Sequence, residues 1–284
     1  MVSQWAKKAA PTSVTRMARV DRCSRRTPRR CSSSAMRRLT RDLGMPSARA
    51  APEKLPWVTT AAKKARSLKS SIENPMQILH LDTSIFGDAS VSRTLSAAIV
   101  AELGRRYPDA RVAYRDLAAR PVAHLDEVIA AGFRPSGIEH FSEADKAQHA
   151  LSEELVKELL ASDIIVLGVP MYNFSVPSQL KAWFDRIAQP GRTFQYTSTG
   201  PVGIAGGKKV IMASTRGGGY SSGPGAVMDF HETYTRAYFG FLGIQDFSVL
   251  RAELLSKGAE LRSLSIKAAL DGVPDAVAAL AEAA

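Results

Sequence analysis

The stretch Ile164-Ile165-Val166-Leu167 places the strongest constraint on how this chain can fold. It is apolar at every position, whereas a strand with one face in water alternates apolar and polar residues. A run this short and this uniformly apolar indicates a parallel strand that is covered on both faces. The surrounding residues should therefore form layers of helices on either side of a sheet.

The same pattern of short apolar runs continues from Met76 to the end of the chain. Residues 78–81, 111–114, 210–212 and 247–250 are expected to be strands, and the stretches between them carry apolar residues at helical spacing, as in 95–103, 151–159 and 180–187. Strands that alternate with helices predict an α/β fold: a doubly wound, five-stranded parallel sheet with helices on both faces.

Residues 1–75 differ in charge from the rest of the chain. They carry 18 Lys and Arg against 4 acidic residues, a net charge of +14, whereas residues 76–284 carry 20 against 23, a net charge of −3. Such a basic segment buries little apolar surface, so we predict a mostly disordered extension over 1–75 and one folded domain over 76–284. The extension could be a nucleic-acid-binding arm, an organelle-type presequence, or an accessory stretch ahead of a translation start at Met76.

Several classes of protein are excluded or disfavoured. Cys23 and Cys31 are the only cysteines, which excludes disulfides, cysteine-ligated metals and cysteine nucleophiles beyond residue 31 and favours a cytoplasmic protein. No apolar run approaches the roughly 18 residues that a membrane helix needs. No metal site is predicted, because the histidines show no ligand spacing: His80, His124, His140, His149 and His231.

Two motif matches fail on their context. Gly219–Gly223 fits the pattern of a hydrolase nucleophile elbow, but Arg216 to Gly218 separate it from the preceding strand. Gly206–Lys209 is like part of a phosphate-binding P-loop, but it lacks the first glycine and the Ser or Thr that follows the lysine. The first strand is not followed by the glycine fingerprint of a dinucleotide site. Hydrolase, nucleoside triphosphatase and Rossmann functions are therefore disfavoured.

A ligand of a doubly wound sheet binds beyond the carboxyl ends of the strands, where the strand order reverses. The loop after the first strand, Thr83–Ser92, offers hydroxyl groups and the N-terminus of a helix expected to begin near Arg93, which together favour a phosphate. In isolation, Ser90 or Ser92 is better interpreted as a simple N-cap.

The loops after the third and fourth strands are also unusual. Val169–Pro177 holds a methionine and two aromatic residues between two prolines, which suits the flat face of an aromatic cofactor or, alternatively, a lid on the core. Ser214–Tyr220 contains three successive glycines, which let the backbone approach a ligand closely or simply form a solvated loop. The three loops together favour a ligand site more than each does alone.

Taken together, these loops resemble those of the FMN-dependent NADH azoreductase and quinone reductase family, which has a flavodoxin-like fold. The resemblance covers residues 76–284. The segments that carry it are Pro170–Phe174 with Gln179–Lys181, Thr193–Tyr196 leading to Gly200–Pro201, and Ser214–Gly218.

The resemblance implies an FMN-dependent oxidoreductase that passes two electrons from NADH or NADPH to quinones and azo compounds by a ping-pong mechanism. It implies a homodimer with active sites at the interface, and no general acid or nucleophile from the protein. The FMN-binding residues that it implies are Ser84, Ser90, Val91 and Ser92 at the phosphate, Met171, Tyr172, Asn173 and Phe174 along the ribityl chain and ring, and Thr215, Arg216, Gly217 and Gly218 at the pyrimidine end.

The residues expected at the substrate are Tyr196, Tyr220 and Phe241, with Tyr196 reaching the partner's flavin. A well-known member of the family has His at the place of Tyr220, and this chain carries a short insertion between Pro224 and Phe239, which leaves the preferred substrate open. Two other functions also remain open: a non-enzymatic flavodoxin-like electron carrier, although residues 76–284 lack the acidic surface of such carriers, and a nucleic-acid-binding protein that uses the extension.

Overall fold

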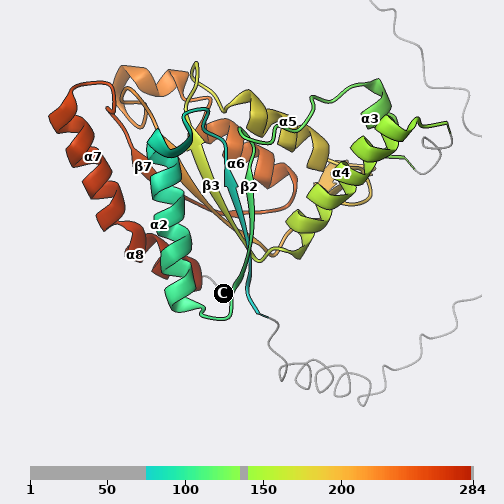
Figure 1. Ribbon diagram of the computed structural model, residues 1–284, viewed down its shortest axis with the longest axis horizontal. Helices are drawn as coiled ribbons and strands as arrows, with labels where there is room; N and C mark the ends of the chain where they lie inside the picture. The colour runs from blue at the N-terminus through green and yellow to red at the C-terminus, as the bar shows by residue number, and fades with distance from the viewer. Residues whose placement is uncertain (1–74, 135–139, 283–284) are drawn as a thin grey trace, which may run out of the picture. The chain divides into compact units, whose positions relative to one another are not determined.

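The computed structural model describes residues 75–134 and 140–282 (Figure 1). The expected basic extension lies outside the described residues except for Pro75, so its predicted disorder stays a prediction. The first strand, β1, begins at Gln77, just after the boundary that the sequence predicts.

Five parallel strands form the central sheet in the order β2-β1-β3-β6-β7. Each predicted strand lies within one of them, and the strand bounds are Gln77–Asp82 for β1, Arg111–Asp116 for β2, Ile164–Pro170 for β3, Lys209–Thr215 for β6 and Asp246–Ala252 for β7. β3 occupies the centre and is buried at every position, as its uniformly apolar sequence predicts. The predicted doubly wound α/β sheet is therefore confirmed.

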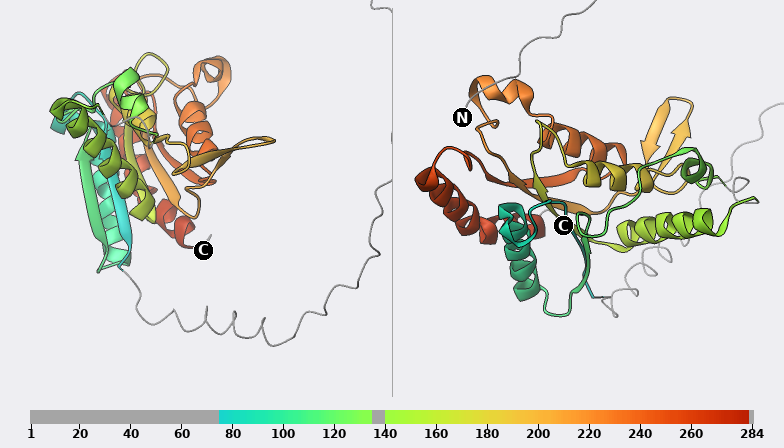
Figure 2. Two further views of the ribbon diagram at one scale, coloured as in Figure 1. Left: turned by 90° about the vertical axis from the view of Figure 1, so that its right-hand side faces the viewer. Right: turned by 45° about the horizontal axis from the view of Figure 1, so that its top comes forward.

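Helices cover both faces of this sheet (Figures 1 and 2). One face carries α2 (Val91–Arg106), α7 (Ala259–Asp271) and α8 (Val273–Glu282), and their apolar residues form one core with strand residues such as Val166 and Ile211. The other face carries α4 (Glu143–Ala161), α5 (Ser178–Ile187) and α6 (Glu232–Phe241), with α3 (Glu127–Ala131) packed against α4. The sheet is packed between these two cores, so the loops at the ends of its strands start from a fixed framework.

The start of α2 differs slightly from the prediction. The helix begins at Val91 rather than near Arg93, because the Ser90 hydroxyl accepts a hydrogen bond from the Arg93 backbone N–H and makes Ser90 the N-cap. α5 begins at Ser178, directly after Pro177, and contains the helically spaced residues 180–187.

An antiparallel hairpin that the strand analysis did not identify stands apart from the sheet (Figure 2). Its strands are β4 (Phe194–Thr197) and β5 (Gly200–Gly203). A Cβ atom on Gly203 would lie 2.1 Å from the backbone of residues 242 and 243, so only glycine lets the hairpin approach the end of α6 this closely. Two 3-10 turns, η1 (Gly87–Ala89) and η2 (Gly223–Met228), complete the described elements.

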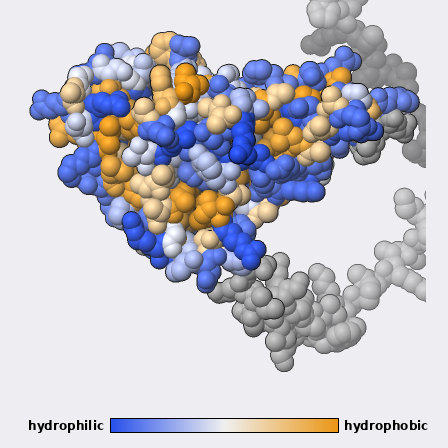
Figure 3. Space-filling view, in the orientation of Figure 1, coloured by the Kyte–Doolittle hydropathy of each residue, from blue (hydrophilic) through white to orange (hydrophobic). Residues whose placement is uncertain are grey.

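In the described ranges, no helix combines the length and the apolar character that crossing a membrane requires. Hydrophilic and hydrophobic side chains are interspersed on the face shown in Figure 3.

Candidate functional site

The strand order reverses between β1 and β3, because β2 follows β1 to one side and β3 follows to the other. The loops after β1, β3 and β6 leave the sheet at the same rim, since all three strands are parallel and adjacent. Two contacts tie these loops together: Thr83 donates through its backbone N–H and its hydroxyl to the carbonyl of Gly168, and the Met171 N–H donates to the carbonyl of Thr215 over 2.8 Å. This rim is where ligands of such sheets bind.

A cavity of about 270 Å³, here called the rim cavity, opens between the three loops. Residues from each predicted loop line it: Ser84, Ser90 and Val91 after β1, Met171 and Tyr172 after β3, and Thr215, Arg216 and Gly217 after β6. The structure thus brings together eight of the twelve residues expected to bind FMN.

The end of the rim cavity beside α2 is suited to an anion. Ser84 and Ser90 are almost fully buried, and Ser90 caps the helix whose N-terminus carries a partial positive charge. Ser92 does not line the cavity; it is fully buried behind it, and its hydroxyl lies 2.9 Å from that of Ser90. Ser90 therefore acts as an N-cap and also faces the cavity, so the two interpretations of this serine are compatible.

Tyr172 forms the wall between the first two loops. Its hydroxyl lies 3.3 Å from the Ser84 hydroxyl and accepts a hydrogen bond from the Ile85 N–H over 3.2 Å. It also borders a second hollow of about 660 Å³, here called the lateral cavity, whose lining includes Asn173, Gln179 and Lys181. Tyr172 is thus shared by both cavities.

Asn173 and Phe174 form a tight turn in which the backbone groups of Tyr172 and Ser175 bond to each other in both directions. Their φ angles are 47° and 71°, the left-handed region, which is costly for a bulky residue such as Phe174. Neither residue lines the rim cavity: Asn173 faces the lateral cavity, and the exposed Phe174 ring packs edge-on against Tyr220 at 6.1 Å. This hydrogen-bonded turn places Asn173 and Phe174 just beyond the end of β3.

The glycine loop after β6 is held by the segment that follows β7. The carbonyls of Arg216, Gly217 and Gly218 accept backbone hydrogen bonds from Leu255, Ser256 and Leu254. Within the part of the chain that the structure describes, the N–H groups of Gly217 and Gly218 donate to no protein acceptor. These N–H groups are therefore free to donate to a ligand.

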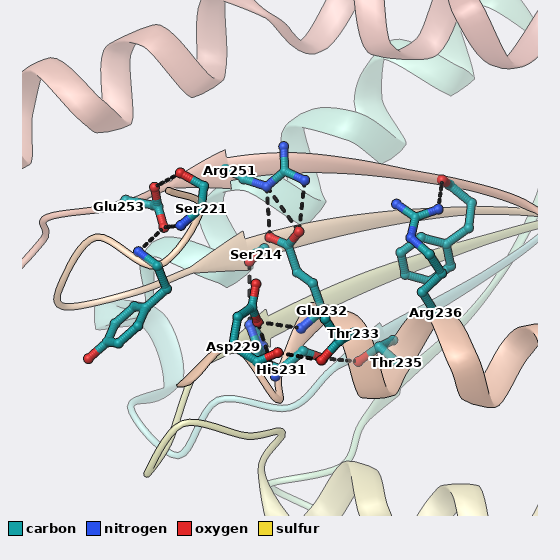
Figure 4. A network of polar contacts seen from close by, with 12 residues as sticks. Ser214, Ser221, Asp229, His231, Glu232, Thr233, Thr235, Arg236, Arg251 and Glu253 are labelled. Carbon is teal, nitrogen blue, oxygen red and sulfur yellow. Dashed lines mark hydrogen bonds and ion pairs between the residues drawn. The ribbon is translucent and has the colours of Figure 1, made fainter. Parts of the chain in front are cut away.

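The Arg216 side chain does not serve the cavity as an exposed cation. It is fully buried, and its guanidinium pairs with the carboxylates of Asp229, Glu232 and Glu253. Arg251 also donates to the Glu232 carboxylate, as Figure 4 shows. Residues Arg216, Asp229, Glu232, Arg251 and Glu253 are called the Arg216 cluster below. Its function in the structure is to anchor the glycine loop.

Glu253 extends this anchor to the residues that follow the loop. Its carboxylate accepts hydrogen bonds from the Tyr220 N–H at 2.7 Å and from the N–H and hydroxyl of Ser221 (Figure 4). Burial would raise the pKa of Glu253, but these hydrogen bonds and the charge of Arg216 outweigh it and lower the pKa. Ser221 is thus occupied as a structural donor, which agrees with the rejection of the nucleophile-elbow motif.

The expected substrate residues are only partly gathered at the rim. None of the three lines the rim cavity or the lateral cavity: Tyr220 packs against Phe174, beyond the end of β3, and Tyr196 and Phe241 lie elsewhere. Tyr196 and Phe241 meet instead at the hairpin, where both rings pack on Phe194. The Phe194 ring centroid lies 5.3 Å from that of Tyr196 and 4.8 Å from that of Phe241. Tyr196 is 74% exposed there. Within one chain, the structure therefore does not place these two residues at the site.

Sequence reasoning missed Leu255, Ser256 and Arg262, which also line the rim cavity. They reach it only because β7 lies beside β6 and directs the start of α7 toward the rim. No sequence motif marks these three residues, so they could not be predicted from the sequence. Among the described residues, no group of three His, Cys, Asp or Glu side chains is arranged to hold a metal ion.

Comparison with known proteins identifies relatives over the described domain. The profile of a family described as having a flavodoxin-like fold matches residues 76–274. The FMN-dependent NADH:quinone oxidoreductase of Ralstonia nicotianae is 61% identical over 202 residues, which are 71% of this chain and 97% of the relative. The FMN-dependent NADH:quinone oxidoreductase 2 of Xanthomonas axonopodis pv. citri is 55% identical over 206 residues, 72% of this chain and 95% of the relative.

Solved structures with the same fold agree with this result. The azoreductase from Bacillus anthracis str. Sterne superposes with a TM-score of 0.65 at 25% identity and covers 71% of this chain and 98% of that protein. The FMN-dependent NADH-azoreductase from Bacillus anthracis str. Ames Ancestor, solved in complex with FMN, superposes with a TM-score of 0.67 at 22% identity, over 72% of this chain and 99% of that protein. The flavodoxin-like fold that the sequence predicts is therefore confirmed.

Proposed function

We propose, from the premise that the chain belongs to the flavodoxin-like family of FMN-dependent NADH:quinone oxidoreductases, that it transfers two electrons from NADH through bound FMN to quinones and aromatic azo compounds. One observation carries the proposal: three loops that are far apart in the sequence line a single cavity at the point where the strand order reverses.

The residues of the rim cavity fit a phosphorylated flavin. No carboxylate lines the cavity, so nothing there repels a phosphate. The Ser84 and Ser90 hydroxyls and the α2 N-terminus supply donors for the phosphate, and Ser92 orients the Ser90 hydroxyl. A complete flavin needs more room than about 270 Å³, and the adjoining lateral cavity at Tyr172 supports its extension in that direction.

Each loop then has a proposed role. Met171, Tyr172, Asn173 and Phe174 contact the ribityl chain and the ring, while Thr215, Gly217 and Gly218 approach the pyrimidine end. Arg216 contributes through its backbone, because its guanidinium is bound within the Arg216 cluster. The unpaired N–H groups of Gly217 and Gly218 offer hydrogen bonds to negative charge at that end of the ring.

When bound, FMN supplies the redox chemistry, since a flavin takes up a hydride from a nicotinamide and delivers two electrons to a second substrate. The protein positions the reactants and excludes water, and we assign no general acid or nucleophile to it. NADH and the quinone or azo compound occupy the same pocket one after the other, which gives ping-pong kinetics. The proposal includes NADPH as an alternative donor and the cytoplasm as the location.

We further propose a homodimer. Tyr196 and Phe241 lie on exposed aromatic surface at the hairpin, away from the rim cavity of their own chain. This surface supports a role across an interface, where Tyr196 reaches the partner's flavin and Phe241 borders the substrate with Tyr220.

The test uses the purified full chain. We expect a yellow protein that releases FMN on denaturation and oxidises NADH when a benzoquinone is added, with parallel lines in double-reciprocal plots. An electron carrier would bind FMN but would not turn over NADH without a partner reductase. A protein that takes up no FMN and oxidises no NADH would contradict the proposal.

A further inference from the structure

We propose that Arg262 binds the phosphate of FMN and makes the rim cavity select FMN over riboflavin, which has the same ring but no phosphate. The inference rests on the proposed function, and it assigns to one residue the discrimination between phosphorylated and unphosphorylated flavin.

Arg262 reaches the rim cavity from a part of the chain that none of the three loops contains. It lies one turn into α7, and it lines the cavity together with Ser90 and Val91 at the start of α2. α7 packs beside α2 on the same face of the sheet (Figure 1). The side chain therefore enters the cavity from the face on which the N-terminus of α2 and its serine hydroxyls lie.

The charge of Arg262 is available to a ligand. None of the described carboxylates forms an ion pair with it, and none lines the rim cavity. The other arginine of the cavity, Arg216, is bound to three carboxylates. Arg262 is thus the cationic side chain in this lining whose positive charge is not already balanced by the described residues.

The chemistry of the group fits a phosphate monoester. A guanidinium presents parallel N–H donors that match two phosphate oxygens, and such charge-assisted bonds are shorter and stronger than neutral ones. A monoester carries between one and two negative charges near neutral pH, more than a helix N-terminus and two hydroxyls balance by themselves. Arg262 supplies the missing positive charge.

The experiment compares Arg262→Gln with wild type as holoenzyme. Each protein is diluted at several salt concentrations, and the released flavin is measured by its fluorescence; exchange with excess riboflavin gives the affinity for the unphosphorylated form. Arg262→Lys tests for partial rescue. Lys267→Gln is the matched control, because Lys267 lies on the same helix, is exposed, and pairs with Asp271 away from the cavity.

We expect Arg262→Gln to weaken FMN binding roughly 10- to 100-fold, as the loss of a charged hydrogen-bond donor would, and to leave riboflavin binding unchanged. The salt dependence of FMN binding should also weaken, while Lys267→Gln behaves as wild type. Equal effects on FMN and riboflavin, or no effect on either, would overturn the inference. A wild-type protein that holds no flavin at all would instead overturn the proposed function.

Discussion

A buried charged cluster lies beside the first loop of the rim cavity and another at the third loop, and the central charges of the two clusters are opposite. The loop after β1 follows Asp82, whose side chain is 2% exposed and accepts hydrogen bonds from Ser96 at 2.7 Å and Tyr114 at 3.1 Å. The glycine loop rests on Arg216, whose side chain is 0% exposed. One cluster is built around a buried anion and the other around a buried cation.

The difference lies in what compensates each buried charge. Hydroxyl groups supply both side-chain hydrogen bonds to Asp82. The nearest basic side chains, His80 at 3.5 Å and Arg93 at 3.8 Å, form no hydrogen bond with it, and Arg93 is bound more closely to Asp116 at 2.5 Å. Arg216 is compensated by three carboxylates, two of them at 3.1 Å. Removing one neutral donor leaves the Asp82 carboxylate with its other hydrogen bond and costs the energy of the lost bond, whereas removing the Arg216 guanidinium leaves three carboxylates uncompensated.

The largest expected effect follows from removing the central cation of the Arg216 cluster. Arg216→Met leaves three carboxylates without their shared partner, so we expect the free energy of unfolding to fall by about 3–5 kcal/mol. Urea unfolding at pH 7 measures it. Arg251→Met is the control: its side chain is 43% exposed and it contacts only Glu232 in the cluster, so its cost should stay below about 1 kcal/mol. Equal losses in the two variants would refute the comparison.

The pH dependence of stability tests His231, a buried histidine beside the Arg216 cluster. His231 is fully buried and its Nδ1 lies 3.4 Å from the Ser214 hydroxyl. Burial, together with the charge of Arg216, lowers the pKa of His231 from 6.5 to about 3. Below pH 6.5 the unfolded chain therefore binds a proton that the folded chain does not, and the stability present above pH 6.5 is lost as the pH falls toward 3.

Between pH 6.5 and 5, this histidine should cost about 2 kcal/mol in the free energy of unfolding. His231→Gln should remove that slope from urea unfolding curves measured over the same range. His124→Gln, a change at an exposed position, should leave it in place. A wild-type stability that is flat from pH 6.5 to 5 would argue against a neutral, buried His231.

The smallest expected effect concerns the hydrogen bonds that Asp82 accepts from Ser96 and Tyr114. Partial burial and the charge of Asp82 raise the pKa of Tyr114 to about 12, so its hydroxyl stays protonated at pH 7 and donates to the carboxylate. Tyr114→Phe removes one of several donors and should cost about 1 kcal/mol. Tyr107→Phe, which removes a hydroxyl without a hydrogen bond in the described residues, should cost less in the same unfolding assay. A loss as large as that of Arg216→Met would erase the contrast between the clusters.

The sequence predicted the sheet well because burial on both faces leaves a direct mark on composition. Ile164 to Leu167 could be assigned to a central parallel strand without any structure. The other strands were predicted from short runs between amphipathic stretches, and β2, at the edge of the sheet, is exposed at four of its six positions. The hairpin was missed because its strands are only four residues long and lack the apolar run or clear alternation of the others. What identifies it is the close approach of Gly203 to the backbone beyond α6, which is a tertiary contact.

The candidate site was predicted to the level of its loops but not of its side chains. Ser84, Ser90, Met171 and Gly217 line one cavity as expected, since the carboxyl ends of adjacent parallel strands must share a rim. The sequence could not tell that the Arg216 guanidinium is bound by the carboxylates of Asp229, Glu232 and Glu253.

By itself, the sequence determined the layers, the strand direction and the three loops at one rim, because periodicity and burial are local properties of the chain. Only the tertiary structure decided which charges pair with each other. Nothing in the sequence distinguishes the surroundings of Arg216 from those of Arg262. Arg216 is bound to three carboxylates, whereas Arg262 lines the rim cavity, whose lining includes none of the described carboxylates. The partners of a charged side chain come from distant segments, so the packing of β6 against β7 and of α7 beside α2 sets them.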